Sequence, residues 1–213
     1  MNSDDLIAAL SRDVRPVRRH AMQVRLLAGL GAGAVLTMVA VVAWLGVRPD
    51  LMIAMHGLTF WIKWGYTGSL GICGTIAAVR LARPDGSVGA ALRLIALPVA
   101  ALAIIAALEL ATTPRAGWLA MWLGHSWTIC SRNVFLLALP IFAGLLWAYR
   151  RLAPTRLALA GMSAGITAGA WGATLYCLHC PETSALFVLT WYSLGMAAAA
   201  ALGAVVGPRA LRW

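Results

Sequence analysis

Hydrophobic residues gather in six long segments that short polar connections separate. The segments run over 24–47, 58–79, 90–111, 133–149, 157–176 and 186–206. Each is close to the ~20 apolar residues that a helix needs to cross ~30 Å of hydrocarbon. Inside a bilayer no water satisfies the backbone, so a helix is the expected conformation. The pattern predicts an all-α, polytopic membrane protein, a bundle of six transmembrane helices in which the fourth helix is the shortest.

Basic residues fall mainly on one side of these predicted helices. Of the 17 Lys and Arg residues, 13 lie in the N-terminal segment, the second and fourth connections and the C-terminal tail. Because Lys and Arg are in excess on cytoplasmic flanks, both termini are predicted to be cytoplasmic, and the first, third and fifth connections face outward. We therefore expect a multi-pass membrane protein with N and C termini in the cytoplasm; in a bacterial cell, the outer side would be the periplasm.

Composition excludes a soluble protein. With 62% hydrophobic and 11% charged residues, the chain has too little polar surface to cover its apolar mass. The net charge of +10 is spread over four membrane-flanking segments, which favours contact with membrane lipid and argues against direct binding of nucleic acid. We predict three parts: a cytoplasmic N-terminal segment over 1–23, a six-helix transmembrane domain over 24–208 and a cytoplasmic tail over 209–213.

The N-terminal segment is expected to form a short amphipathic helix. Ser3 can cap its start, apolar residues then recur at helical spacing, and Pro16 would end it. Two interpretations stay open: the helix lies on the inner leaflet, or it docks on a cytoplasmic protein. In the second case the predicted partner-binding residues are Leu6, Ile7, Leu10, Asp13, Val14 and Arg15.

Reactive side chains gather on the predicted outer side. They are the cysteines Cys130, Cys177 and Cys180 and the histidines His56, His125 and His179. In an oxidising periplasm nearby thiols tend to pair. Cys130 could join Cys180 and link the third connection to the fifth, or Cys177 could join Cys180, and spacing alone does not decide. The same residue types suit zinc, copper(I) or cadmium, so we predict at most transient binding of a soft metal and no resident cofactor.

Two charged residues lie within the apolar segments. Lys63 and Glu109 are expected to reach the membrane surface or to pair with each other. Glycines recur at helical spacing, as at Gly29 and Gly33 or Gly161 and Gly165, which predicts closely packed helices.

Motifs of common enzymes are absent from the sequence. It has no G-x-S-x-G, H-E-x-x-H or Walker loop and no paired intramembrane carboxylates, so we predict that the protein is not an enzyme. Two alternatives stay open. A thiol oxidoreductase that passes electrons to quinone would need two outer cysteine pairs, and a soft-metal transporter would need a deep row of ligands.

Several motifs, in order along nearly the whole chain, resemble the NrsF family of bacterial membrane anti-sigma factors. They are Leu6-Ile7-x-x-Leu10-x-x-Asp13-x-x-Pro16-Val17, Gly124-His125-Ser126-Trp127-x-x-Cys130, Ala153-Pro154-Thr155-Arg156, Tyr176-x-x-His179-Cys180-x-Glu182, Trp191-Tyr192 and Gly207-Pro208-Arg209. The resemblance implies a six-span protein that holds an extracytoplasmic-function sigma factor inactive on the cytoplasmic side. It also implies release under envelope, heavy-metal or oxidative stress, sensed at outward-facing cysteines.

The cysteines match the family only in part. The paired cysteines of the family correspond to Cys130 and Cys180, so the resemblance implies that these two form the sensing pair. Cys73 and Cys177 are additional to the family pattern.

Overall fold

The described part of the chain is helical and contains no β-strand. A computed structural model describes residues 3–12, 20–81, 88–152 and 154–212. The long helices are α2 (Ala21–Ala40, continued by a π-helical turn at Val41–Leu45), α4 (Leu58–Leu81), α5 (Val88–Thr112), α7 (Trp127–Tyr149), α8 (Leu157–Tyr176) and α10 (Ser193–Ala210). The short elements are α1 (Ser3–Arg12), α3 (Leu51–Met55), a 3₁₀ turn at Arg115–Gly117, α6 (Trp118–Leu123) and α9 (Ala185–Phe187, continued by a π-helical turn at Val188–Tyr192).

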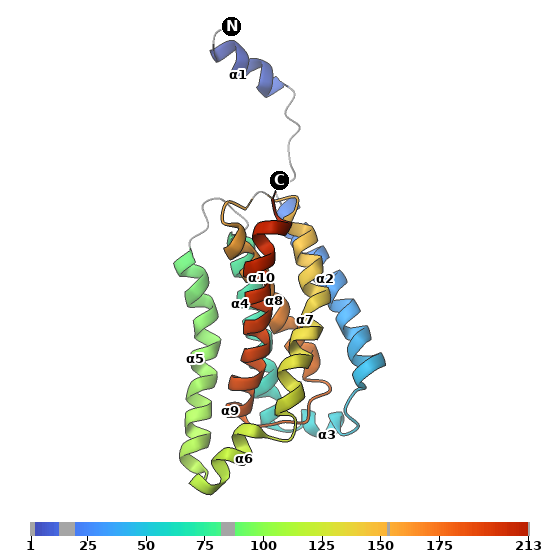
Figure 1. Cartoon of the computed structure of the whole chain (residues 1–213), viewed down its shortest axis with the longest axis vertical. Coiled ribbons are helices and arrows are strands. Elements are labelled where there is room, and N and C mark those ends of the chain that lie inside the picture. Colours follow the sequence, from blue (N-terminus) through green and yellow to red (C-terminus); the bar gives the residue numbers. More distant parts are fainter. Residues whose placement is uncertain (1–2, 13–19, 82–87, 153, 213) are drawn as a thin grey trace.

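The long helices run alongside one another in one bundle (Figure 1). The start of α2 and the end of α10 lie at the same end of the bundle, which we call the terminal end. The short helices α3, α6 and α9 lie at the opposite end, called the thiol end below. The six long helices alternate in direction, and an even number of passes returns the chain to the end of the bundle where it began.

Four helical stretches in the described residues are long and apolar enough to cross a membrane: Ala21–Leu45, Leu92–Thr112, Arg115–Tyr149 and Ala185–Ala210. The other two long helices, α4 and α8, are interrupted by Gly, Ser and Thr, and α4 also carries Lys63. Helix α8 contacts α4, α7 and α10, and 13 of its 20 residues are buried. A helix surrounded by other helices needs small side chains for close packing more than it needs hydrophobicity.

Glycines bring two pairs of helices into close contact, as their spacing predicted. A Cβ at Gly161 or Gly203 would collide with the backbone of the other residue, so α8 and α10 pack through both. Gly29 and Gly144 make the equivalent contact between α2 and α7. These contacts fix the helices that carry the reactive groups at the thiol end.

Helix α7 differs from its prediction. It begins at Trp127, six residues before the predicted start at 133, and its 23 residues make it longer than α8, so the expectation that the fourth helix is the shortest is wrong. One polar residue in the added turns is paired inside the bundle: Ser131 Oγ donates to Trp191 O at 2.7 Å. The added turns also carry the buried Cys130. Hydropathy alone left residues 127–132 in a loop, although Ser131 has a partner on a neighbouring element.

Candidate functional site

Two thiols from distant parts of the chain meet at the thiol end. Cys130 lies in the first turns of α7, and Cys180 lies in the segment that joins α8 to α9. Their sulfur atoms are 3.8 Å apart, and both residues are completely buried. This separation is longer than the S–S distance of about 2.05 Å in a disulfide, so the two cysteines are in contact but not bonded to each other in this structure.

The other two cysteines have different surroundings. Cys177, at the end of α8, is also fully buried, and its Sγ lies 3.9 Å from Thr67 Oγ1 on α4. Cys73 lies in the middle of α4 and is half-buried. Of the two pairings that the spacing left open, the structure places Cys130 and Cys180 in thiol contact.

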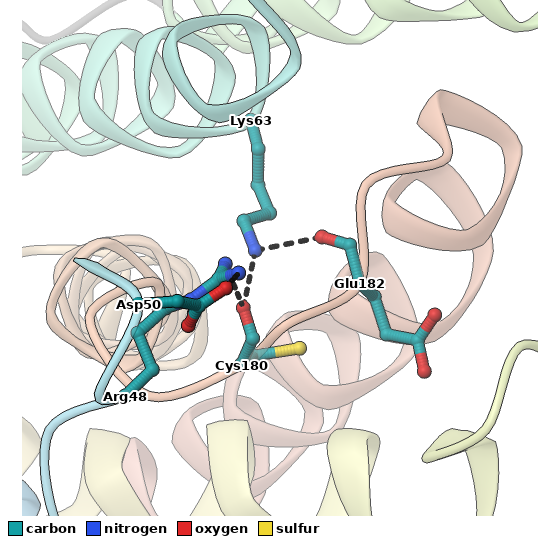
Figure 2. A network of polar contacts seen from close by, with 5 residues as sticks. All are labelled: Arg48, Asp50, Lys63, Cys180 and Glu182. Carbon is teal, nitrogen blue, oxygen red and sulfur yellow. Dashed lines mark hydrogen bonds and ion pairs between the residues drawn. The ribbon is translucent and has the colours of Figure 1, made fainter. Parts of the chain in front are cut away.

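Lys63 holds the backbone of the segment that carries Cys180 (Figure 2). Its side chain is 2% exposed, and Nζ donates to Cys180 O and to Glu182 O, both at 2.8 Å. The expectation that Lys63 reaches the surface or pairs with Glu109 is therefore wrong, because two backbone carbonyls satisfy the ammonium inside the bundle.

Glu109 has a separate structural role. Its Oε2 accepts hydrogen bonds from Ser184 Oγ at 3.0 Å and Leu186 N at 3.1 Å. Ser184 is the N-cap of α9, and its Oγ accepts from Phe187 N. A carboxylate is favourable beside unpaired N–H groups at a helix start, so Glu109 fixes α9 to the end of α5.

A second cation approaches the same carbonyl from the first connection. Arg48 forms a bidentate pair with Asp50, with distances of 2.7 and 2.6 Å, and its Nη1 is 3.4 Å from Cys180 O. The Arg48 backbone N–H donates to Leu178 O at 3.0 Å. Figure 2 shows Lys63 and Arg48 converging on the Cys180 carbonyl from different elements.

The Glu182 carboxylate joins the Cys180 segment to the start of α7. Its Oε1 accepts from His125 N at 2.7 Å, Ser126 N at 3.0 Å and Ser126 Oγ at 3.1 Å. Gly124 permits this contact, since its φ of +55° is unfavourable for other residues and a Cβ there would collide with Glu182 Oε2. The two segments that carry the thiols are thus connected by polar bonds beside the sulfur contact.

The environment makes the two cysteines of the fifth connection unlike each other. The hydrogen bond with the Cys130 thiol, supported by the positive charge of Lys63, lowers the pKa of Cys180 although burial opposes this shift. Burial raises the pKa of Cys177 to about 11. The thiolate is the nucleophile in thiol chemistry, so Cys180 is the better placed of the two to react near neutral pH.

The three predicted metal-binding histidines lie apart. His179 Nδ1 is 2.8 Å from Gly46 O and its ring packs on Tyr176, whereas His56 and His125 have exposed side chains. In the described ranges no three His, Cys, Asp or Glu side chains are grouped so that they could hold a metal ion. The structure lends no support to a metal site there, nor to a transporter lined by these histidines.

The predicted partner-binding residues lie on α1 and just after it. Helix α1 is present over Ser3–Arg12, in agreement with the predicted N-terminal helix, and lies beyond the terminal end of the bundle in Figure 1. Leu6 and Ile7 are exposed, by 44% and 64%. Leu10 is within the helix, and Asp13, Val14 and Arg15 lie outside the described residues.

Comparison with known proteins identifies the protein family of this chain. Residues 10–213 match the family described as NrsF, negative regulator of sigma F. The chain belongs to this family. It is 41% identical over 214 residues to the anti-sigma-F factor NrsF of Caulobacter vibrioides, and 36% identical over 213 residues to the probable anti-sigma-F factor NrsF of Azospira oryzae.

Both NrsF matches cover the whole of both chains, so the resemblance read from the sequence motifs is confirmed. No solved structure matches the chain. The sequence reasoning found the thiols of this NrsF-family protein but missed the roles of Lys63, Glu182 and Gly124. The available signals were that Lys63 is a single Lys within an apolar segment and that Gly124 directly precedes His125.

Proposed function

We propose that this protein is a membrane anti-sigma factor that releases its sigma factor when the Cys130 and Cys180 thiols are oxidised. In the resting state it would hold a sigma factor of the extracytoplasmic-function class inactive at the inner membrane. Family membership and the names of the two relatives support a sigma F partner. The observation that carries the sensing role is the contact of the two buried thiols, 3.8 Å apart, at the end of the bundle away from the chain termini.

The proposed topology has six spans with both termini in the cytoplasm. Four helical stretches meet the length and hydropathy criteria, and α4 and α8 run parallel to them within the same bundle. The excess of basic residues in the segments that flank the terminal end supports a cytoplasmic position for that end. The thiol end would then face the periplasm, where oxidants reach it without entering the cell.

Release requires two packings of the bundle with different affinities for the sigma factor. A signal shifts such an equilibrium only by its differential free energy between the two states. A difference of ~3 kcal/mol between the reduced and oxidised forms would change the affinity for the sigma factor ~150-fold. A disulfide would supply this difference if only one packing brings the two sulfur atoms to bonding distance.

Cysteine replacement tests the sensor. Cys130→Ser and Cys180→Ser, alone or together, are expected to abolish the induction of sigma-dependent genes by oxidants while the protein stays in the membrane. Cys73→Ser is the matched control, because Cys73 lies in the middle of α4 away from the pair. Unchanged repression and unchanged induction in the double variant would rule out thiol sensing.

The sigma-binding surface is proposed to include the exposed apolar face of α1. Leu6→Glu should weaken co-purification of the sigma factor by about tenfold, because an apolar anchor buried in a groove contributes on the order of 1 to 2 kcal/mol. Ala8→Glu places the same charge at another exposed position of α1 and is the control. If both variants retain the sigma factor at the membrane equally, α1 is not the docking element and instead lies on the leaflet.

A further inference from the structure

Lys63 is a buried cation without a carboxylate partner in the described ranges. The only ion pair there joins Arg48 to Asp50. Carbonyl dipoles of Cys180 and Glu182 satisfy the hydrogen bonds of the ammonium but do not neutralise its charge. An uncompensated buried charge costs several kcal/mol. A negative group close to Lys63 would offset that cost.

The groups around Cys180 leave few candidates for this negative charge. The Glu182 carboxylate is bonded to the start of α7, and Asp50 is bonded to Arg48. The remaining titratable neighbours are the Cys130 thiol of α7, Cys177 and Tyr176 at the end of α8, Tyr192 before α10, and His179, which packs on Tyr176. Among them a thiol ionises most readily near neutral pH.

We propose that Lys63 is a positioning residue that stabilises the Cys180 thiolate and so makes Cys180 the nucleophile of the pair, with Cys130 as the resolving thiol. The inference rests on the proposed function, in which oxidation of this pair is the signal. Lys63 binds the carbonyl of Cys180 itself, and Arg48 approaches the same atom, whereas no cation is bonded to Cys130 in the described residues. Cys180 is therefore the sulfur with positive charge at its own backbone.

A hydroperoxide is the class of oxidant that this arrangement suits. The Cys180 thiolate attacks one peroxide oxygen, the O–O bond breaks, and Cys180 becomes a sulfenic acid while the leaving alkoxide or hydroxide takes up a proton. The Cys130 thiol then attacks the Cys180 sulfur, a disulfide forms and water leaves. Together the two thiols lose two electrons, and the peroxide is reduced to water, or to water and an alcohol.

A groove open to solvent lies beside the buried pair, although neither cysteine lines it. This groove, of about 430 Å³ at the thiol end, is lined by Ile129, Tyr176 and His179, among others. Ile129 precedes Cys130 in the chain, and His179 precedes Cys180. The groove therefore reaches the residues that precede both cysteines in the chain, so a small local opening at Ile129 or His179 would admit a small oxidant.

Oxidation also changes the electrostatics of Lys63. A disulfide carries no charge, so the buried ammonium loses its counter-ion when the bond forms. The cost of keeping Lys63 between the Cys180 and Glu182 carbonyls then rises, which favours a different position of α4 relative to the Cys180 segment. Helix α4 runs from the thiol end to the terminal end of the bundle, so a displacement of α4 would also move its residues at the terminal end.

Titration of the thiolate tests the inference directly. In full-length protein in lipid nanodiscs, with Cys73, Cys130 and Cys177 replaced by Ser, the ultraviolet absorbance of the Cys180 thiolate is measured against pH. Lys63→Met is expected to raise the midpoint by about 1 to 3 pH units, the usual effect of removing an opposite charge near an ionised group. Lys63→Arg should restore the lower midpoint. Arg115→Met, which removes an exposed cation stacked on Trp118, is the control.

A second measurement asks which of the two cysteines is oxidised first, in variants that retain Lys63. With hydrogen peroxide and dimedone, the Cys130→Ser variant should accumulate trapped sulfenic acid on Cys180 at least about tenfold faster than Cys180→Ser accumulates it on Cys130. If Lys63→Met leaves the titration midpoint of Cys180 unchanged, the proposed role of Lys63 is wrong. If the sulfenic acid is trapped faster on Cys130 than on Cys180, the proposed role is also wrong, and this result does not require Lys63→Met to fold. Neither measurement involves a sigma factor. A negative result would therefore refute the role of Lys63 without refuting the anti-sigma proposal, which is tested separately by gene induction.

Discussion

Removing the Glu182 carboxylate should loosen the thiol end as a whole. In Glu182→Ala, the N–H groups of His125 and Ser126 and the Ser126 hydroxyl lose their shared acceptor, at present 2.7 to 3.1 Å away. A hydrogen bond to a charged group contributes about 1.5 to 3 kcal/mol, and three bonds to one oxygen are not additive, so we expect a loss of about 3 kcal/mol. At 2 to 4 °C per kcal/mol for a chain of this size, the unfolding midpoint should fall by about 6 to 12 °C.

Thermal unfolding of the purified protein, followed by circular dichroism, measures this loss. Glu182→Gln keeps an acceptor oxygen and should lie between the wild type and Glu182→Ala. Asp50→Ala is the matched control: it removes a carboxylate from the same end, but one that is solvent-exposed and paired only with Arg48, so the unfolding midpoint should change little. Equal midpoints for Glu182→Ala and Asp50→Ala would refute the idea that Glu182 joins the two thiol-bearing segments.

Two further predictions concern the helix packing below the site. Gly203→Leu should lower the unfolding midpoint strongly, because a side chain there collides with the backbone of Gly161 and overpacking costs about 1 to 3 kcal/mol. Gly31→Ala is the control: no atom lies within 4 Å of the added Cβ, so the midpoint should stay unchanged in the same assay. Tyr149→Phe removes a buried hydrogen bond of 2.8 Å to Ala78 O and should cost about 1 kcal/mol, measured as a shift in the denaturant midpoint.

Hydropathy and glycine spacing predicted most of the fold because they report local properties of each helix. The bounds of α8 agree with the predicted segment at both ends, and the glycine contacts between α8 and α10 follow from the spacing. The start of α7 was missed for a tertiary reason. Ser131 looks like a loop residue until its partner, the carbonyl of Trp191, is known.

The candidate site was predictable only as far as single residues carry chemistry. A cysteine indicates thiol chemistry by its residue type alone. Cys130 and Cys180 were therefore identified from the sequence, and their contact was among the pairings considered. Lys63 was expected at the surface because a lone charge in an apolar segment usually escapes burial. Its partners are backbone carbonyls, which have no signature in a sequence. The same holds for Glu182, whose partners are mainly the backbone N–H groups of another connection.

The position of Lys63 also constrains the order in which the chain can assemble. The carbonyl groups that satisfy its ammonium belong to residues 117 and 119 positions later in the chain. While the second half of the protein is still being synthesised, the Lys63 ammonium lacks both of these carbonyl partners. Helix α4 can therefore adopt its final packing only after Cys180 and Glu182 have been made. A chain that stops short of them would leave a charged side chain on α4 without the acceptors that bury it in the complete bundle.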